Sequence, residues 1–204
     1  MTRDHDPFTQ ALLSLRERVV RNVYGAGQPI VIVEEARRLK VSVTPVREAL
    51  SRLSGEGFVE RAASGGYFSP RLDAAIVRDR YTFQLTCLKA ALALVAPAVV
   101  FSISAQPAAT RSIFDQIIRR SGSSALADAY QRVSALLGVF ASVEGILIPD
   151  REQEARELHR CLADPERRGL IDALERYHGR RIALAADVVT ALGEGGSQAD
   201  HPDT

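Results

Sequence analysis

The stretch Val41-Ser42-Val43-Thr44-Pro45-Val46-Arg47-Glu48-Ala49-Leu50-Ser51-Arg52-Leu53 predicts a helix with two different faces. Thr44 is a favourable N-cap, and Pro45 then falls at the first helical position, where its missing N–H costs nothing. Apolar residues recur from Val46 at helical spacing. The opposite face carries hydroxyls and cations, namely Ser42, Thr44, Arg47, Ser51 and Arg52. This face suits a phosphate-lined groove, and an ordinary solvated helix face is the alternative.

The segments on either side of this helix predict a helix-turn-helix followed by a hairpin. We expect a first helix over 8–24, a stub strand over 29–32 and a short helix over 34–39, and a tight turn then leads into the quoted stretch. Two short strands follow, 58–61 and 67–69, joined by a turn that contains Gly65 and Gly66. This order of elements is typical of a winged helix-turn-helix.

Residues 11–71 resemble the DNA-binding head of GntR-type bacterial regulators. The family run V-S-R-T-P-V-R-E-A-L is matched at nine of ten positions by residues 41–50, and L-x-x-E-G-[LF]-V is matched by residues 53–59. The mismatch is Val43, where the family has a groove-reading arginine. The usual operator is therefore in doubt, and Val43 could instead contact a thymine methyl group.

The resemblance and the residue chemistry together give a set of expected DNA contacts. Arginines and hydroxyls are expected at phosphates and base edges, and the Gly-rich hairpin tip is expected in the minor groove. A plain turn is the alternative for the two glycines. The expected contacts are Arg37, Arg38, Ser42, Val43, Thr44, Arg47, Ser51, Arg61, Gly65 and Gly66.

Composition and charge are those of a cytoplasmic protein without a membrane span. The 204 residues are 46% hydrophobic and 25% charged, and charges interrupt every apolar run. The N-terminus lacks the apolar core of a signal peptide. Cys87 and Cys161 predict reduced thiols. The formal charge is +3 over residues 1–72 and −2 over the rest, which fits a nucleic-acid-binding head on a non-binding body.

The rest of the chain predicts an antiparallel all-helical bundle, which makes the whole protein mainly α. We expect a winged helix-turn-helix domain over 8–71, a helical effector-binding and dimerisation domain over 72–192, and disordered ends over 1–7 and 193–204. Asp73 is expected to cap the first body helix. The expected body helices are 74–101, 110–121, 126–147, 151–162 and 164–192.

A GntR-type head followed by a helical body resembles the FCD (FadR-like) subgroup. In that subgroup the bundle binds a small carboxylate, often through a metal held by an aspartate and three histidines. This chain departs from the pattern, because Gln84 stands near an expected arginine, Arg111 at the expected aspartate and Asp115 at the first histidine. His159 and His178 remain on the last helices. The effector-binding candidates are Gln84, Arg111, Asp115, His159 and His178.

These departures predict that no cofactor is needed and that the metal site is degenerate. If zinc or nickel were bound, its ligands would be Asp115, His159 and His178. For both histidines a structural or surface role is the alternative. Arg111 and Asp115 could form an ion pair along one helix face, or Arg111 could bind an anionic ligand directly.

The sequence predicts a sequence-specific DNA-binding regulator, a repressor, that acts as a homodimer on a palindromic operator and takes a small organic acid as effector. A ligand-blind body that only dimerises is one alternative. A winged helix that binds protein, supported only by Val43, is another. An enzyme is not expected, since the chain has no nucleophile elbow, phosphate loop or complete metal triad.

Overall fold

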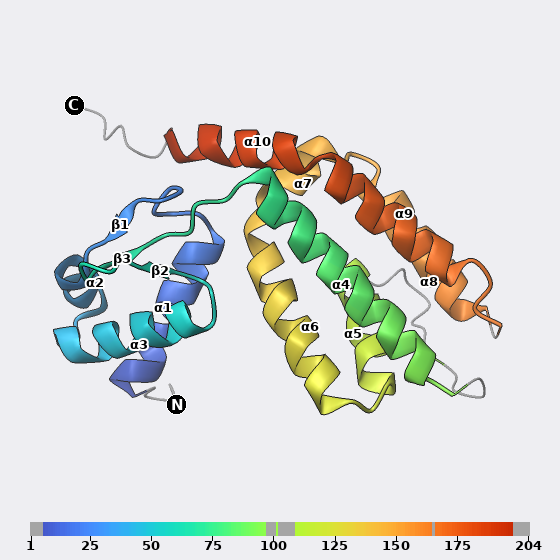
Figure 1. Cartoon of the computed structure of the whole chain (residues 1–204), viewed down its shortest axis with the longest axis horizontal. Coiled ribbons are helices and arrows are strands. Elements are labelled where there is room, and N and C mark those ends of the chain that lie inside the picture. Colours follow the sequence, from blue (N-terminus) through green and yellow to red (C-terminus); the bar gives the residue numbers. More distant parts are fainter. Residues whose placement is uncertain (1–5, 97–100, 102–108, 165, 198–204) are drawn as a thin grey trace. The chain divides into compact units, whose positions relative to one another are not determined.

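The computed structural model describes residues 6–96, 101, 109–164 and 166–197. The chain folds as two compact units, Met1–Leu72 with Val189–Thr204, and Asp73–Val188. The predicted fold class is confirmed: a small three-stranded sheet accompanies the N-terminal helices, and helices form the second unit (Figure 1). No helix in the described part of the chain is both long and apolar enough to cross a membrane.

The first unit contains three helices near its start: α1 (Pro7–Val20), α2 (Ile32–Leu39) and α3 (Val43–Gly55). The apolar stripe of α3, from Val46 to Leu53, is buried, and α3 packs against α1, whose Ala11 and Leu15 are also buried. Burial of a leucine-sized side chain contributes about 2 kcal/mol. This packing fixes the orientation of α3 about its own axis, so that its polar face is exposed.

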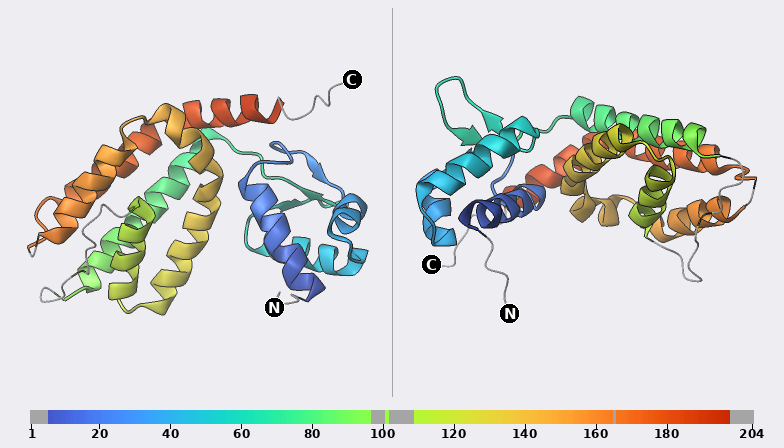
Figure 2. Two further views of the ribbon diagram at one scale, coloured as in Figure 1. Left: turned by 180° about the vertical axis from the view of Figure 1, so that it is seen from behind. Right: turned by 90° about the horizontal axis from the view of Figure 1, so that it is seen from below.

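A three-stranded antiparallel sheet accompanies these helices. The strands are β1 (Pro29–Ile30), β2 (Glu60–Arg61) and β3 (Tyr67–Phe68), in the order β1-β3-β2. Ile30 pairs with Tyr67, and Tyr67 pairs with Arg61 on its other side. In Figure 2, seen from below, the β2–β3 connection projects away from the helices of this unit.

The start of α3 differs from the prediction by two positions. Ser42, not Thr44, is the N-cap, with extended backbone angles, so Thr44 and Pro45 lie inside the first turn. Proline is tolerated there because the first N–H groups of a helix have no intrahelical acceptor. The first helix also begins and ends earlier than expected. It starts at Pro7, capped by Asp6, and ends before Asn22, whose positive φ of 53° is a conformation that asparagine accepts.

In the described part of the second unit, six α-helices precede the last one, α10. The helix α4 packs against α5, α6 and α9, so it lies at the centre, and the capping bond from Ile76 N–H to Asp73 is present at 2.8 Å. The six helices are α4 (Ala74–Leu94), α5 (Thr110–Arg120), α6 (Ser124–Leu137), α7 (Ala141–Leu147), α8 (Arg151–Ala163) and α9 (Leu170–Ala183).

Three body helices differ from their predicted extents. The first ends at Leu94, short of Phe101, and the helix expected over 126–147 is interrupted by a 3₁₀ turn, Gly138–Phe140. The long final helix is two helices. The first of the two, α9, starts only at Leu170, because Arg167 and Gly169 adopt positive φ angles that interrupt an α-helix, and α9 ends at Ala183.

The final helix, α10 (Ala185–Ser197), continues five residues into the segment that we expected to be disordered. Its residues from Val189 onward group with the first unit, where Asn22 Nδ2 donates to the Leu192 carbonyl at 3.2 Å. The expected loop over 102–108 and the outer ends of both termini, 1–5 and 198–204, lie outside the described residues. The expected domain boundaries stay predictions.

A buried carboxylate joins α2 to α1 in the first unit. Glu35 is 5% exposed, and its side chain accepts bonds from Arg38 Nε (2.9 Å) and Nη2 (2.7 Å). Arg18 Nε on α1 lies 3.3 Å from the other carboxylate oxygen, and Arg38 also donates to Ser14 Oγ at 2.9 Å. The sequence analysis did not single out Glu35, because a glutamate in a polar run carries no sign of burial. Its network holds α2 at a fixed position beside α1.

We expect Glu35→Ala to lower the free energy of unfolding by about 1–3 kcal/mol, since charge-assisted hydrogen bonds are lost while both arginines can still reach water. Urea unfolding followed by circular dichroism measures this. Glu34→Ala is the matched control, because Glu34 is exposed on the same turn without an ion pair in the described structure. Equal stabilities for the two variants would contradict the assigned role of Glu35.

Candidate functional site

The exposed face of α3 presents the predicted contact residues together. Thr44, Arg47 and Ser51 are all exposed on it. Arg47 forms no ion pair or hydrogen bond with any described residue, whereas Arg52 on the same helix is bound to Glu56 at 3.0 Å. The Arg47 guanidinium is therefore free to bind a base edge or a phosphate without breaking a contact inside the protein.

The N-terminus of α3 carries unused hydrogen-bonding groups. Ser42 caps the helix by its backbone alone, since its side chain makes no capping bond. The N–H groups of Val43 and Thr44 have no acceptor within the helix. Val43 itself is 39% exposed. A helix N-terminus with exposed N–H groups favours an anion such as a phosphate, and Val43 adds an apolar contact beside it.

The β2–β3 connection has the geometry expected of a wing tip. Gly65 and Gly66 are exposed with φ angles of 91° and 90°, a conformation that glycine adopts without strain. The turn is closed by Gly65 N–H donating to the Ala62 carbonyl at 2.9 Å. Arg61, exposed at the end of β2, has no ion pair in the described structure. Its guanidinium is available at the base of the tip.

The two α2 arginines in the predicted set differ in their surroundings. Arg37 is exposed and has no ion pair among the described residues. Arg38 is bound to Glu35 and Ser14, so its guanidinium holds α2 in place. Lys40, which follows them in the turn, adopts a positive φ of 56°, and Val41 N–H donates back to the Ala36 carbonyl at 3.0 Å. This turn connects α2 to α3.

In the second unit, two of the predicted effector residues line one small cavity. Gln84 is buried on α4, and Arg111 is exposed on α5, so the arginine lies at the cavity mouth. The cavity volume is about 130 Å³. Sequence reasoning missed its other polar lining residues, because tyrosine and serine within helical patterns predict packing as readily as binding. These residues are Tyr81, Tyr130, Ser134, Glu144 and Tyr177.

The cavity contains a polar group that has no partner. Tyr130 is fully buried, and its hydroxyl makes no hydrogen bond of normal geometry in the described structure, although Ser134 and Asp115 are near it. Burial raises the pKa of Tyr130 most; Ser134 and Arg111 lower it and the Asp115 carboxylate raises it, with a net increase, so the hydroxyl remains protonated. A buried hydroxyl without a partner is unfavourable by about 1–3 kcal/mol, and a bound acceptor would remove that penalty.

His178 is buried beside this cavity but does not line it. Its Nδ1–H donates to the Leu174 carbonyl at 2.7 Å, and its Nε2 lies 3.2 Å from Gln84 Oε1. The amide nitrogen of Gln84, Nε2, donates to the Ser134 hydroxyl at 2.9 Å. The ring stacks on Phe114 with centroids 5.5 Å apart. Burial lowers the pKa of His178 to about 4, so the ring is neutral at pH 7.

The residues proposed as metal ligands do not fit a metal. Nδ1 of His178 is bonded to the Leu174 carbonyl, Nε2 is covered by the Gln84 carboxamide, and Arg111 places a positive charge at the cavity mouth. Within the described residues no three His, Cys, Asp or Glu side chains are close enough to hold an ion. Asp115 and Arg111 form no ion pair with each other, although one Asp115 oxygen is buried without a hydrogen bond. His159, half-buried on α8, does not line this cavity.

Known proteins resemble this chain in two ways: in the sequence of its N-terminal residues and in its overall fold. The family described as "Bacterial regulatory proteins, gntR family" matches residues 8–68. The "Nta operon transcriptional regulator" of Aminobacter aminovorans is 49% identical over 55 residues, 27% of this chain and 26% of that protein. The chain thus aligns with about a quarter of the length of this curated relative.

Two solved structures share the fold over most of the chain. "E. coli McbR/YncC" aligns with a TM-score of 0.64 and 18% identity, covering 90% of this chain and 98% of that one. A putative transcriptional regulator GntR from Rhodococcus sp. RHA1 aligns with a TM-score of 0.68 and 14% identity, covering 92% and 99%. At these identities the similarity shows the fold alone.

The buried His178 predicts a specific dependence of stability on pH. Its pKa is about 4 in the folded chain and about 6.5 when unfolded, so the unfolded state binds more protons between these values. Stability should be constant above pH 6.5 and should fall toward pH 4 by about 3 kcal/mol from this group. Unfolding titrations of wild type and His178→Gln across pH 4–7.5 measure it. Parallel profiles for the two proteins would contradict the assignment.

Proposed function

We propose that the chain is a sequence-specific DNA-binding transcriptional regulator, a repressor, in the cytoplasm, and the premise is that residues 8–68 match the gntR family of bacterial regulatory proteins. The observation that carries the proposal is the polar face of α3. Its exposed Arg47 has no partner among the described residues, and the N–H groups at the start of the same helix are not bonded by a capping side chain. Both features suit contact with nucleic acid.

The proposed contacts divide into base reading, phosphate binding and a wing. Arg47 and Val43 face base edges in the major groove, while Ser42, Thr44, Ser51 and Arg37 bind phosphates. The further contacts are Arg61, Gly65 and Gly66 in the wing. Arg38 acts indirectly by holding α2, since its guanidinium is bound within the unit. An exposed valine at position 43 removes a guanine-reading donor and favours a thymine methyl group.

The protein is proposed to act as a homodimer on a palindromic operator. One winged-helix head supplies few base contacts, and a two-fold dimer doubles them and fixes the half-site spacing. A repressor of this kind needs no catalytic group.

Selection of bound sequences from random duplex DNA tests this function and reports the half-site spacing. Affinity for the selected site should fall steeply with salt, because phosphate contacts release counterions. Weak binding that is flat with salt would favour the alternative, a winged helix that binds protein.

On the selected operator, Arg47→Ala should weaken specific binding by about 1–3 kcal/mol, with little change in binding to random DNA. Fluorescence anisotropy with labelled duplexes measures both affinities. Arg52→Ala is the matched control on the same helix, since Arg52 is bound to Glu56. If the two variants bound equally well, another element would have to read the bases.

A second proposal is that the cavity of the helical unit binds a small carboxylate effector without a metal. It rests on the Arg111 guanidinium at the mouth and on the unpartnered Tyr130 hydroxyl inside. These two donors could bind the two oxygens of one carboxylate. The volume of about 130 Å³ limits the ligand to a small acid. Gln84 then lines the cavity, whereas Asp115, His159 and His178 do not line it.

Arg111→Gln should weaken binding of such an acid at least about tenfold, because a charge-assisted hydrogen bond contributes roughly 1.5–3 kcal/mol. A thermal-shift screen of small mono- and dicarboxylates identifies the ligand and measures the loss. Arg119→Gln is the control, as an exposed arginine on the same helix. If no acid stabilises the wild type, the alternative holds, a ligand-blind body that only dimerises.

A further inference from the structure

The small cavity of the helical unit is lined by charges of both signs. Arg111 lies at its mouth, and the Glu144 carboxylate from α7 also lines it. Arg111 forms no ion pair with Glu144 or any other described residue, so a gap remains between the two charges. In a volume of about 130 Å³, a ligand that carried only a carboxylate would bring its negative charge toward Glu144 as well as toward Arg111. Like charges repel, so the cavity favours a ligand with a positive charge of its own.

The Glu144 carboxylate has hydrogen-bonding capacity that the protein does not use. Its Oε1 accepts from the Tyr81 hydroxyl and from Arg181 Nε, the latter at 3.2 Å. Its Oε2 has only a long contact of 3.4 Å with Arg181 Nη2 among the described residues. A carboxylate oxygen carries two lone pairs, and hydrogen bonds of normal length are about 2.7–3.2 Å. Oε2 can therefore accept a further hydrogen bond from a ligand.

The ionic network that contains Glu144 holds one more negative charge than positive charge. Arg181, which is 2% exposed, binds both Glu144 and Glu154, and its Nη1 donates to Glu154 at 3.0 Å. Arg180 in turn binds Glu154 and Asp150. Three carboxylates thus share two guanidinium groups. Arg181 therefore neutralises Glu144 only in part, and a cation beside Glu144 would balance the network.

Aromatic rings form much of the remaining cavity lining. The four aromatic residues are Tyr81, Phe114, Tyr130 and Tyr177. The electron-rich face of an aromatic ring attracts an ammonium or guanidinium group. One such contact already exists among these residues, since the guanidinium carbon of Arg181 lies 3.4 Å from the centroid of the Tyr177 ring. A carboxylate among aromatic rings suits an ammonium group better than it suits an anionic group.

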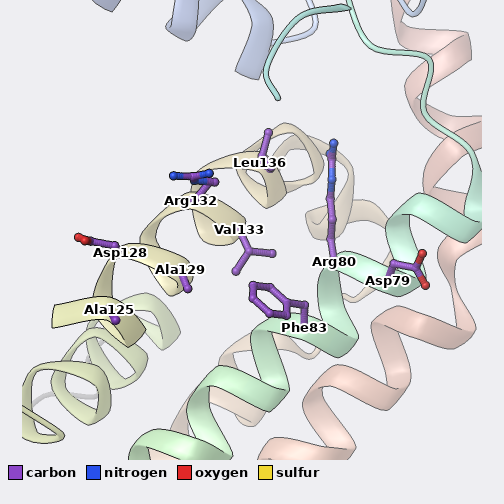
Figure 3. Close-up of a pocket in the computed structure, with 9 residues that line it drawn as sticks. All are labelled: Asp79, Arg80, Phe83, Ala125, Asp128, Ala129, Arg132, Val133 and Leu136. Carbon is purple, nitrogen blue, oxygen red and sulfur yellow. The ribbon is translucent and has the colours of Figure 1, made fainter. Parts of the chain in front are cut away.

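A wider groove of the same unit, between α4 and α6, suits a small ligand less well. Its volume is about 650 Å³, so such a ligand would fill only part of it. Figure 3 shows Phe83 facing Val133 across an apolar floor, with Arg80 and Asp128 beside it. Phe83 is 48% exposed, and Asp128 is also exposed. Charges that stay in contact with water bind ions weakly, whereas the Tyr130 hydroxyl of the smaller cavity is fully buried.

We infer that the smaller cavity selects a small zwitterion, an amino acid with one ammonium and one carboxylate group, over a simple carboxylic acid. The ligand carboxylate binds Arg111 and the Tyr130 hydroxyl, and the ligand ammonium group donates to Glu144 Oε2 among the aromatic rings. This selection rests on the proposed small-carboxylate site and narrows the class of its ligand. Glu144 is the residue that determines the specificity.

Ligands that differ in a single group test the selection on the full-length chain, with isothermal titration calorimetry as the readout. L-alanine, L-lactate and propionate carry an ammonium group, a hydroxyl group and a hydrogen atom at the same carbon. In a second series, β-alanine and 3-hydroxypropionate carry the group one carbon further from the carboxylate. In at least one series the amino acid should bind at least about tenfold more tightly than its hydroxy and unsubstituted counterparts, because only the ammonium group pairs with Glu144.

Glu144→Gln keeps the shape and a hydrogen-bond acceptor but removes the negative charge. This variant should reduce the preference for the amino acid from about tenfold to less than about twofold. Glu154→Gln is the matched control, because it removes the other carboxylate that binds Arg181 but Glu154 does not line the cavity. The preference should persist in this control. Circular dichroism checks that both variants are folded.

The outcomes separate the selection from the site on which it rests. Lactate, 3-hydroxypropionate or propionate binding as tightly as the amino acids would overturn the selection and leave the carboxylate site standing. An equal loss of affinity for all ligands in Glu144→Gln would also overturn it, because Glu144 would then act only by holding Arg181. If neither these compounds nor any acid of the thermal-shift screen bound, the carboxylate site would fail as well. The wild-type comparison is decisive even if Glu144→Gln does not fold.

Discussion

The packing of α3 against α1 is the constraint that fixes the direction of the exposed polar face of α3. Val46 and Leu50 are fully buried, so the helix cannot rotate about its axis without exposing them. Burial of two such side chains is worth several kcal/mol, which is comparable with the whole stability of a small domain. Arg47 and Ser51 therefore face solvent in a fixed direction. The Glu35 network then holds α2 beside this pair, so the position of the turn depends on the same packing.

The buried polar groups of the helical unit are of two kinds, those with polar neighbours in contact and those without. Around His178 the polar groups contact one another: its Nδ1–H donates to the Leu174 carbonyl, its Nε2 faces the Gln84 carboxamide, and Gln84 donates to Ser134, so this histidine behaves as part of the core. A few side chains away, the Tyr130 hydroxyl and one Asp115 oxygen have no partner in the described structure. Proteins rarely leave buried polar atoms unsatisfied without a functional reason. The contrast distinguishes a structural histidine from a cavity able to receive a ligand.

Local sequence patterns predicted much of this fold, and they failed where distant contacts decide. Helical periodicity located α3 and α5, and Asp73 was correctly predicted as a cap, because these signals lie within a few residues. The break at Gly169 was missed, since Asp164-Pro165 also begins helices. Glu35, Tyr130 and Arg80 could not be singled out, because burial, lack of a partner and position beside a groove depend on residues far away in the sequence. The replacement of the usual arginine by Val43 could be recognised only by comparison with the family motif.

The Ser42 N-cap, whose side chain makes no capping bond, has a consequence for the stability of the first turn of α3. A serine side chain that makes no capping bond leaves the first turn of α3 less stable by about 1 kcal/mol than a fully capped helix. A phosphate held at this end would restore that stability, as any ligand that binds only the native state does. Molecules seated on DNA would then open this turn less often than free ones.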